Sequence, residues 1–170
     1  MAVAHSIAAD LTEAVIDGLA ALFADDDDFN GTTAPEQKTV VSYGFSFGSR
    51  VAEHVYLGSM NADTPPVAIR TGRNFRKEDG TFNLTVLVRL PGADAPTAIR
   101  RLFAIGHEVE DYIGARKSGE GLGVTGLQTL TVASWAADYA GIDSGTGALL
   151  TYSIAWTARL DDSVTDSVTP

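Results

Sequence analysis

The chain has 170 residues, with 22 acidic side chains against 12 basic ones and a net charge of −10. This charge argues against a protein that holds nucleic acid by neutralising phosphates, although a duplex that only slides past is compatible with it. The chain has no cysteine, which excludes a disulfide framework and thiolate metal sites. No segment approaches the about 20 uninterrupted apolar residues of a membrane span, so we expect a soluble, unprocessed protein without membrane contact.

The first predicted element is an amphipathic helix over Val3–Ala24. Its apolar residues recur three and four positions apart and include Ile7, Leu11, Val15 and Leu22. The run Asp25–Asp28 follows, and a calcium loop would alternate its ligands around a glycine, which this run does not do. We therefore interpret the run as a solvated loop rather than a metal site.

Alternating apolar residues predict strands over Lys38–Phe47 and, more weakly, over Val51–Leu57. Asn61–Pro66 is expected to be a turn, because its two prolines disfavour a sheet interior.

The next segment carries the pattern of a β-hairpin. Val67–Lys77 and Thr81–Leu90 are expected to be its strands, and Glu78-Asp79-Gly80 is expected to be the reverse turn between them. Leu87 is the one apolar residue out of step in the second strand. The charged tip of this hairpin would stand away from the core.

A long helix is predicted after Asp94, which is a suitable N-cap, with Pro96 in its first turn and Arg116 near its end. Gly119 or Gly121 is expected to end it. The predicted buried stripe is made by Ile99, Leu102, Phe103, Gly106, Val109 and Ile113.

Two final strands are predicted over Leu127–Ala137 and Leu149–Leu160, separated by a loop at Gly141–Gly147. Together the elements predict an α+β fold with one domain over residues 1–162, followed by a flexible acidic tail over residues 163–170. The sheet should be mostly antiparallel and curved, with the N-terminal helix and the long central helix packed on it.

No catalytic constellation is recognisable. His5, His54 and His107 lie in different predicted elements, and no nucleophile motif accompanies His107, the best acid–base candidate beside Glu108. Gly119–Gly123 resembles half of a dinucleotide fingerprint, but it follows a helix instead of a strand. We expect no enzymatic activity, no cofactor and no metal.

Two groups of residues could form surfaces for partners. Trp135, Tyr139, Tyr152 and Trp156 are expected in the core or at an interface rather than around a ligand. The basic residues are concentrated in one part of an acidic chain. They could form a patch in a lumen or at a subunit interface, or they could be a solvated rim balanced by Glu78 and Asp79. These basic residues are Arg70, Arg73, Arg76, Lys77 and Arg89.

These features together resemble the tail terminator proteins of long-tailed, siphovirus-type bacteriophages, particularly those of actinobacterial hosts. The resemblance rests on the N-terminal helix, on the Arg-rich segment Arg70–Glu78 leading into Thr81–Leu90, on Ile99–Ile105 and Glu108–Tyr112 of the central helix, and on the closing strand pair.

The resemblance implies a structural virion protein, assembled in the host cytoplasm, that forms a homohexameric ring at the head-proximal end of the tail tube. One ring face would bind the major tail protein and end its polymerisation, and the other would bind the head-completion or stopper protein. Genomic double-stranded DNA would pass through the lumen without sequence-specific binding. The family has no catalytic residues to transfer.

Two alternatives remain open from the sequence. Within a phage, the chain could be another head–tail connector, such as a stopper or adaptor, or a tail tube protein. Outside phages, it could be a small α+β module that encloses a ligand between Phe45, Phe82, Phe103 and Trp156.

Overall fold

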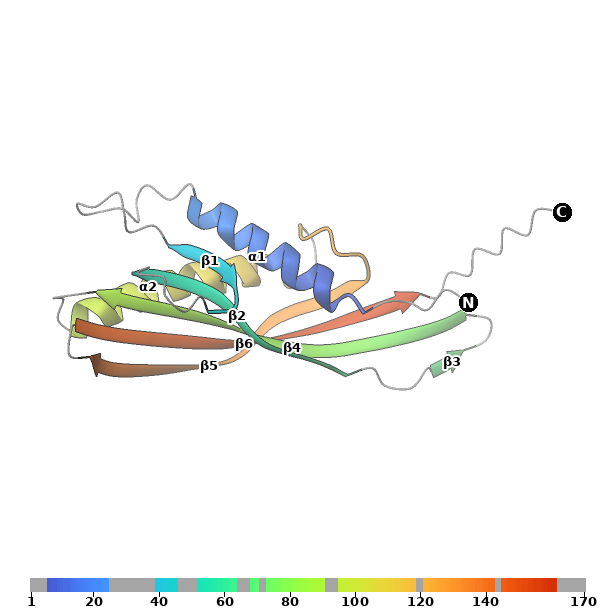
Figure 1. Cartoon of the computed structure of the whole chain (residues 1–170). Coiled ribbons are helices and arrows are strands. Elements are labelled where there is room, and N and C mark those ends of the chain that lie inside the picture. The colour runs from blue at the N-terminus through green and yellow to red at the C-terminus, as the bar shows by residue number, and fades with distance from the viewer. Residues whose placement is uncertain are drawn as a thin grey trace.

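A computed structural model describes residues 6–24, 39–45, 52–63, 68–70, 73–90, 95–118, 121–142 and 145–161. Within these residues, two helices lie on one face of a single β-sheet (Figure 1). The elements are α1 (Ala8–Ala24), β1 (Val40–Tyr43), β2 (Glu53–Asp63), β3 (Ala68–Arg70), β4 (Arg73–Leu90), α2 (Ala95–Gly114), β5 (Leu127–Ile142) and β6 (Gly145–Asp161). The predicted single-domain α+β fold is confirmed.

The sheet has the strand order β1-β2-β4-β6-β5, and β3 pairs with the start of β4. β1 and β2 are parallel, whereas every other described pair is antiparallel. β4 and β6 are the long central strands, and their register runs from Phe75 opposite Asp161 to Leu90 opposite Thr146. β1 with β2 therefore forms one lateral margin of the sheet and β5 forms the other.

The alternation of side chains along the central strands explains why only one face carries the helices. Even-numbered residues of β4 and β6 from residue 78 onward point toward α1 and α2, and their odd-numbered neighbours point to the opposite face, here called the open face. The helix-side residues that fill the core are Phe82, Leu84, Val86, Val88, Ala148, Leu150, Tyr152, Ile154, Trp156, Ala158 and Leu160.

Helix α1 starts where Ser6 accepts a hydrogen bond from the Ala8 amide at 3.1 Å. The buried carboxylate of Glu78, in β4, accepts another from the Ile7 amide at 3.1 Å, and its negative charge faces the positive end of the helix dipole. The Tyr112 side chain of α2 reaches α1 at Gly18, where a Cβ atom would collide with its hydroxyl oxygen.

Helix α2 begins within one residue of the predicted N-cap, and Arg116 donates a hydrogen bond to the carbonyl oxygen of Tyr112 at 3.0 Å near its end. Its buried face contains Ala98, Leu102, Ile105, Gly106, Val109, Tyr112 and Ile113. The predicted stripe was wrong about Phe103, which is exposed, and Ile99 is only half-buried. Neither described helix is long and apolar enough to cross a membrane.

The predicted reverse turn at Glu78-Asp79-Gly80 was wrong. All three residues lie inside β4, opposite Ala158, Thr157 and Trp156 of β6. Local turn signals are overruled here by long-range partners, because Glu78 holds the start of α1 and Gly80 makes room for the Trp156 ring. The change of direction instead falls between β3 and β4, whose residues Arg70 and Arg73 are opposite each other.

Two other predicted loops are strands in the structure. Asn61, Ala62 and Asp63 belong to β2 and pair with Thr81, Gly80 and Asp79. β5 and β6 pair as far as Ile142 and Gly145, so most of the expected Gly141–Gly147 loop belongs to the two strands. Backbone hydrogen bonds between strands do not require alternating apolar side chains, which is why the sequence pattern did not predict this pairing. The Asp25–Asp28 run, His5 and the tail over residues 163–170 lie outside the described residues.

A buried polar contact ties α2 to the β1/β2 margin. Arg101 donates hydrogen bonds to both carboxylate oxygens of Glu53, at 2.5 and 2.6 Å, and the hydroxyl of Thr39 donates to the same carboxylate at 2.9 Å. Glu53 and Thr39 are buried, so this network fixes the position of the margin relative to the helix.

Candidate assembly surfaces at the two sheet margins

The structure divides the basic residues that the sequence groups together. Arg70, Arg73, Arg76 and Lys77 lie at the β3 end of β4, where Lys77 is opposite Arg159. Arg89 lies at the other end of β4, opposite Gly147. Twelve residues of extended strand span about 40 Å. Arg89 therefore cannot belong to one patch with the other four.

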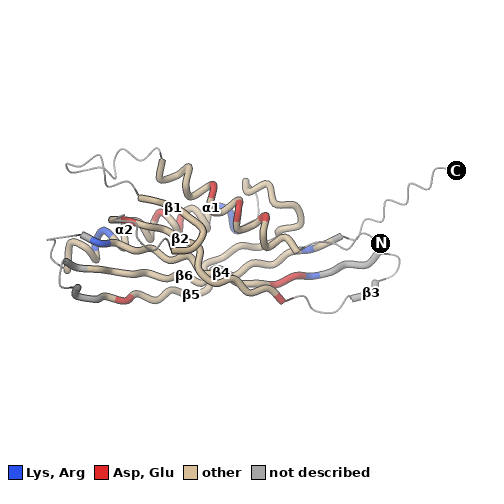
Figure 2. Tube along the Cα trace, viewed as in Figure 1, with Lys and Arg blue, Asp and Glu red and all other residues tan. Residues whose placement is uncertain are grey.

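The two basic side chains with described surroundings have local partners. Lys77 lies 3.0 Å from a carboxylate oxygen of Asp79, and the lysine side chain is largely exposed whereas the aspartate is partly buried. The Arg89 guanidinium lies over the Phe45 ring, 5.4 Å from its centroid. Lys77 is therefore balanced by a local charge, and Arg89 is held by a cation–π contact on the open face. Figure 2 shows that the middle of β4, β6 and β5 carries few charges.

The two histidines among the described residues, His54 and His107, lie in different elements, β2 and α2. His107 is exposed on α2 and lies 3.4 Å from Asp111, one turn further along the same helix. His54 is buried on β2, where its Nε2 atom lies 2.7 Å from the Ser42 hydroxyl and its Nδ1 atom has no hydrogen-bond partner among the described residues. Burial first, and then the positive charge of Arg89, lowers the pKa of His54.

The four aromatic residues considered as a ligand enclosure do not meet. Phe82 and Trp156 are buried neighbours in the core. Phe103 lies on the outer side of α2, and Phe45 packs beside His54 on the open face, with ring centroids 5.8 Å apart. The structure therefore gives no support to a pocket between them. In the described part of the chain, no three acidic, histidine or cysteine side chains gather as metal ligands.

The exposed large apolar side chains are concentrated at the two margins of the sheet. Among the described residues they form two groups, one on β1 and β2 and one on α2 and β5. The first group contains Val40, Tyr43 and Met60, and the second contains Phe103, Trp135 and Tyr139. Trp135 and Tyr139 were expected in the core or at an interface from their strand pattern, whereas the exposure of the other four side chains was not predicted.

The second group forms a continuous apolar shelf, here called the aromatic shelf. Trp135 and Phe103 stack edge to face, with ring centroids 6.0 Å apart. Trp135 is 56% exposed and Tyr139 is 47% exposed. Their orientation follows from a β-bulge between Val132 and Ser134, after which the odd-numbered residues of β5 share a face with Tyr152 and the helices.

The backbone of β5 is open on its outer side. Among the described residues β5 has one neighbouring strand, β6, and the Leu130 amide is bonded to the Lys117 carbonyl oxygen at 3.0 Å. Beyond that point residues 131–139 are mostly exposed and contain Asp138 as their only charged residue. An edge strand of this length without lysine or proline is a template for another strand.

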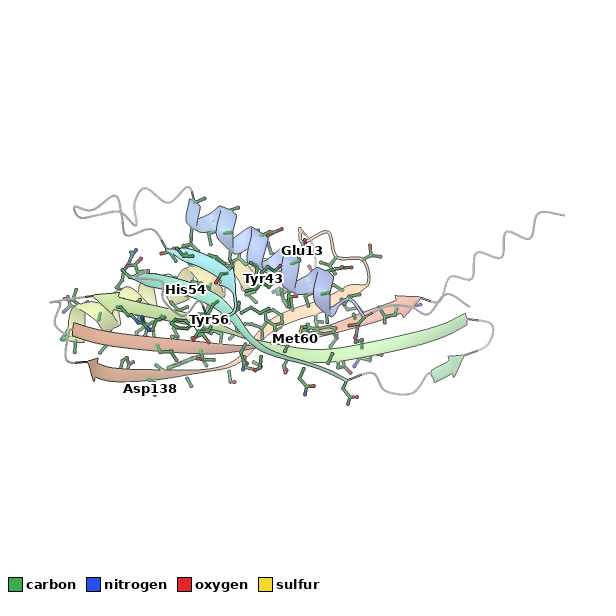
Figure 3. All side chains as sticks on the ribbon, viewed as in Figure 1. Glu13, Tyr43, His54, Tyr56, Met60 and Asp138 are labelled. Carbon is green, nitrogen blue, oxygen red and sulfur yellow. The ribbon has the colours of Figure 1, made fainter. Side chains whose placement is uncertain are left out.

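The opposite margin has a similar opening. Within the described chain, β1 covers β2 from His54 to Leu57, residues 58 and 59 lie at a register shift, and residues 60–63 pair with β4 only. All six of these residues are exposed. Figure 3 labels Tyr43 and Met60 on this margin and Asp138 on β5.

Tyr43 and Trp135 occupy the two ends of one cross-strand row. Tyr43 is opposite Leu57, Leu57 is opposite Leu84, Leu84 is opposite Tyr152, and Tyr152 is opposite Trp135. Residues opposite each other point to the same face, so both aromatic rings lie on the helix side.

Partial desolvation, followed by the charges of Glu13 and Asp17 on α1, raises the pKa of Tyr43.

The open face between the margins is rich in hydroxyl groups. Hydroxyl pairs connect neighbouring strands, with 3.3 Å between the oxygens of Thr85 and Thr151 and 2.8 Å between those of Thr129 and Thr157. The charged side chains described on this face lie toward its ends. Its centre therefore offers no cluster of cations that would retain phosphates.

Comparison with solved structures identifies the fold. The chain is similar to a chain described as part of the virion of a native gene transfer agent particle, with a TM-score of 0.52 and 18% sequence identity. The alignment covers 92% of this chain and 98% of that chain. No protein-family model and no curated protein sequence matches the chain. The similarity shows that the two chains share their whole fold.

Proposed function

We propose that this protein is a structural virion protein and, specifically, the tail terminator of a long-tailed bacteriophage of an actinobacterial host. The shared fold with a chain of a gene transfer agent virion carries this proposal, because the alignment spans nearly the whole of both chains. The sequence resemblance to tail terminators, which rests on other observations, supports the same role. The role is non-enzymatic, and it places the protein at the junction of head and tail.

In this role, copies of the chain form a homohexameric ring on the last ring of the tail tube. One face contacts the major tail protein and the other contacts the head-completion protein, after assembly in the host cytoplasm. The two open sheet margins support a ring, because unlike surfaces on opposite sides of a subunit join copies head to tail, and such contacts form a ring when the rotation between copies closes. The hydroxyl-rich open face suits a lumen that passes DNA without holding it.

The test is deletion of the gene from the phage, followed by electron microscopy of the particles. A terminator stops tube growth, so its loss should give tails much longer than normal that lack heads, and supplying the protein in trans should restore normal length. Headless tails of normal length would instead indicate a stopper or adaptor, and absence of tails would indicate a tube subunit. Either result would overturn the terminator assignment. Cryo-electron microscopy of intact virions should locate the ring at the head-proximal end of the tube.

A further inference from the structure

We propose that copies of this chain join head to tail, with β5 of one copy adding as a strand to the β1/β2 margin of the next copy. The aromatic shelf of the first copy would then cover Tyr43 and Met60 of the second. This inference rests on the proposed function, since it names the surfaces that build the ring.

Strand direction supports this pairing. β5 is antiparallel to β6, β6 to β4 and β4 to β2, so β5 runs antiparallel to β2 and to its parallel neighbour β1. A second copy placed beside the first, in the same orientation, would meet β5 with an antiparallel margin. Its open amide and carbonyl groups could then be satisfied by the more stable of the two ladder patterns.

The apolar side chains support the same arrangement. Trp135 and Tyr139 lie on the helix side of one margin. Tyr43 and Met60 lie on the helix side of the other, since Met60 is opposite the buried Phe82. Continuing the sheet from copy to copy keeps the helix sides together, which buries these rings against one another and against the methionine thioether.

Charges beside the apolar groups are complementary. The exposed Arg100 lies one helical turn before Phe103, next to the aromatic shelf. Glu13 and Asp17, exposed on α1, are close enough to Tyr43 to influence its hydroxyl. A joint that places the aromatic shelf on Tyr43 therefore brings a basic residue toward two acidic ones.

The size of the margin is adequate for a stable contact. Residues 131–139 extend about 30 Å, and a helix layer on a sheet layer presents an edge about 20 Å high. The resulting area of about 600 Å² per copy approaches the roughly 800 Å² per partner of a standard interface. Opposite margins of one subunit can each form this contact once, so copies join head to tail instead of in an isolated pair, and they form a ring when the rotation between copies closes.

Cysteine cross-linking tests the inference directly, because the chain has no cysteine of its own. Ser134→Cys on β5 and Ser59→Cys on β2 are isosteric changes at exposed positions. Ser134 is opposite Ser153, which is opposite Asn83, and the Asn83 side-chain amide donates a hydrogen bond to the Ser59 hydroxyl, so the two positions lie at opposite ends of one cross-strand row. The double variant, treated with a flexible bifunctional thiol reagent, should give a ladder of covalent oligomers that ends at the ring. Ser134→Cys combined with Ser118→Cys, an exposed position after α2, is the control and should give no such ladder.

Three results would overturn the inference. The first is an oligomeric protein whose double variant forms no ladder. The second is cross-linking of Ser134→Cys alone into dimers, which would indicate that β5 pairs with itself. The third is a purified protein that stays monomeric at every concentration. Trp135→Glu should dissociate the oligomer while leaving the circular dichroism spectrum unchanged. Lys77→Glu, an exposed change on the central strand β4, should leave the oligomer intact. The place of the protein in the virion is measured separately by microscopy, so a wrong interface and a wrong function are distinguishable.

Discussion

The indole ring of Trp156 occupies the space that a side chain at residue 80 would need. A Cβ atom on Gly80 would lie 2.5 Å from two ring carbons and 2.8 Å from the carbonyl oxygen of Asn61. Both neighbours are fixed, since Trp156 is buried and Asn61 is part of the β2–β4 ladder. A glycine in the middle of the longest strand is therefore required for the ring to pack flat against β4.

This contact predicts the effect of Gly80→Ala. The extra methyl group should displace the ring or the backbone and lower the free energy of unfolding by about 2 kcal/mol, as overpacking of a core does. Urea denaturation followed by tryptophan fluorescence measures the change. Gly58→Ala is the matched control, because its Cβ atom would lie 3.5 Å from the nearest atoms and β2 is exposed there. Equal effects of the two substitutions would contradict the packing explanation.

The Glu53–Arg101 pair predicts a large loss of stability when one partner is removed. Glu53→Ala would leave the mostly buried guanidinium of Arg101 without its carboxylate, which should cost about 3 kcal/mol of unfolding free energy. Asp79→Ala removes a partner of the exposed pair with Lys77 and should change the unfolding free energy by less than about 1 kcal/mol. Denaturant titration at neutral pH measures both changes in unfolding free energy. A larger loss for Asp79→Ala than for Glu53→Ala would contradict the burial of the Glu53–Arg101 pair.

The buried His54 predicts a stability that depends on pH. Its pKa is lowered in the folded protein, so the unfolded chain binds the proton more readily. The stability associated with neutral His54 is present above the unfolded pKa of about 6.5 and is lost as the pH falls through the lower folded pKa. Urea midpoints between pH 8 and pH 5 should decline less in His54→Gln than in the wild type.

The contradicting result is equally specific. If the urea midpoints of His54→Gln and of the wild type declined by the same amount between pH 8 and pH 5, His54 would not be the group responsible for the pH dependence.

Complementary charges at the proposed joint predict a rescue by charge exchange. Arg100→Glu should weaken the oligomer by up to about fivefold in dissociation constant, as expected for an exposed ion pair, and high salt should have a similar effect. Glu13→Arg alone should weaken the oligomer in the same way, and adding it to Arg100→Glu in the same chain should restore the affinity. Analytical ultracentrifugation measures the two single variants and the double variant. If the double variant is weaker than both single variants, Arg100 and Glu13 do not face each other across the joint.

The elements with a complete local pattern could be predicted from the sequence. The alternation in β6 and the three- and four-residue spacing in α1 and α2 give the correct element type, because one face of each is buried in the same core. The fold class follows from the order of these elements. The Glu78-Asp79-Gly80 segment shows the limit, since its partners Ile7 and Trp156 lie about 70 positions away in both directions.

The candidate assembly surfaces were less accessible to prediction. Phe103 fits the apolar stripe of α2 by spacing, yet the helix is rotated so that Ala98, Leu102 and Ile105 face the sheet instead. The face occupied by Trp135 depends on a β-bulge that cannot be predicted from the residue types in β5. The distance between Lys77 and Arg89 likewise depends on β4 being continuous, which the apparent turn concealed.

The bulge after Val132 has a consequence for how this surface could change during evolution. It inserts one residue, Ala133, between two paired rows. With regular pairing past Val132, Ala133 would lie opposite Ser153 and Trp135 opposite Thr151, which would turn Trp135 and Tyr139 to the open face although the buried core of β4 and β6 stayed intact. Substitutions that replaced the bulge by regular pairing could thus abolish or redirect attachment to a neighbour while the domain itself still folds.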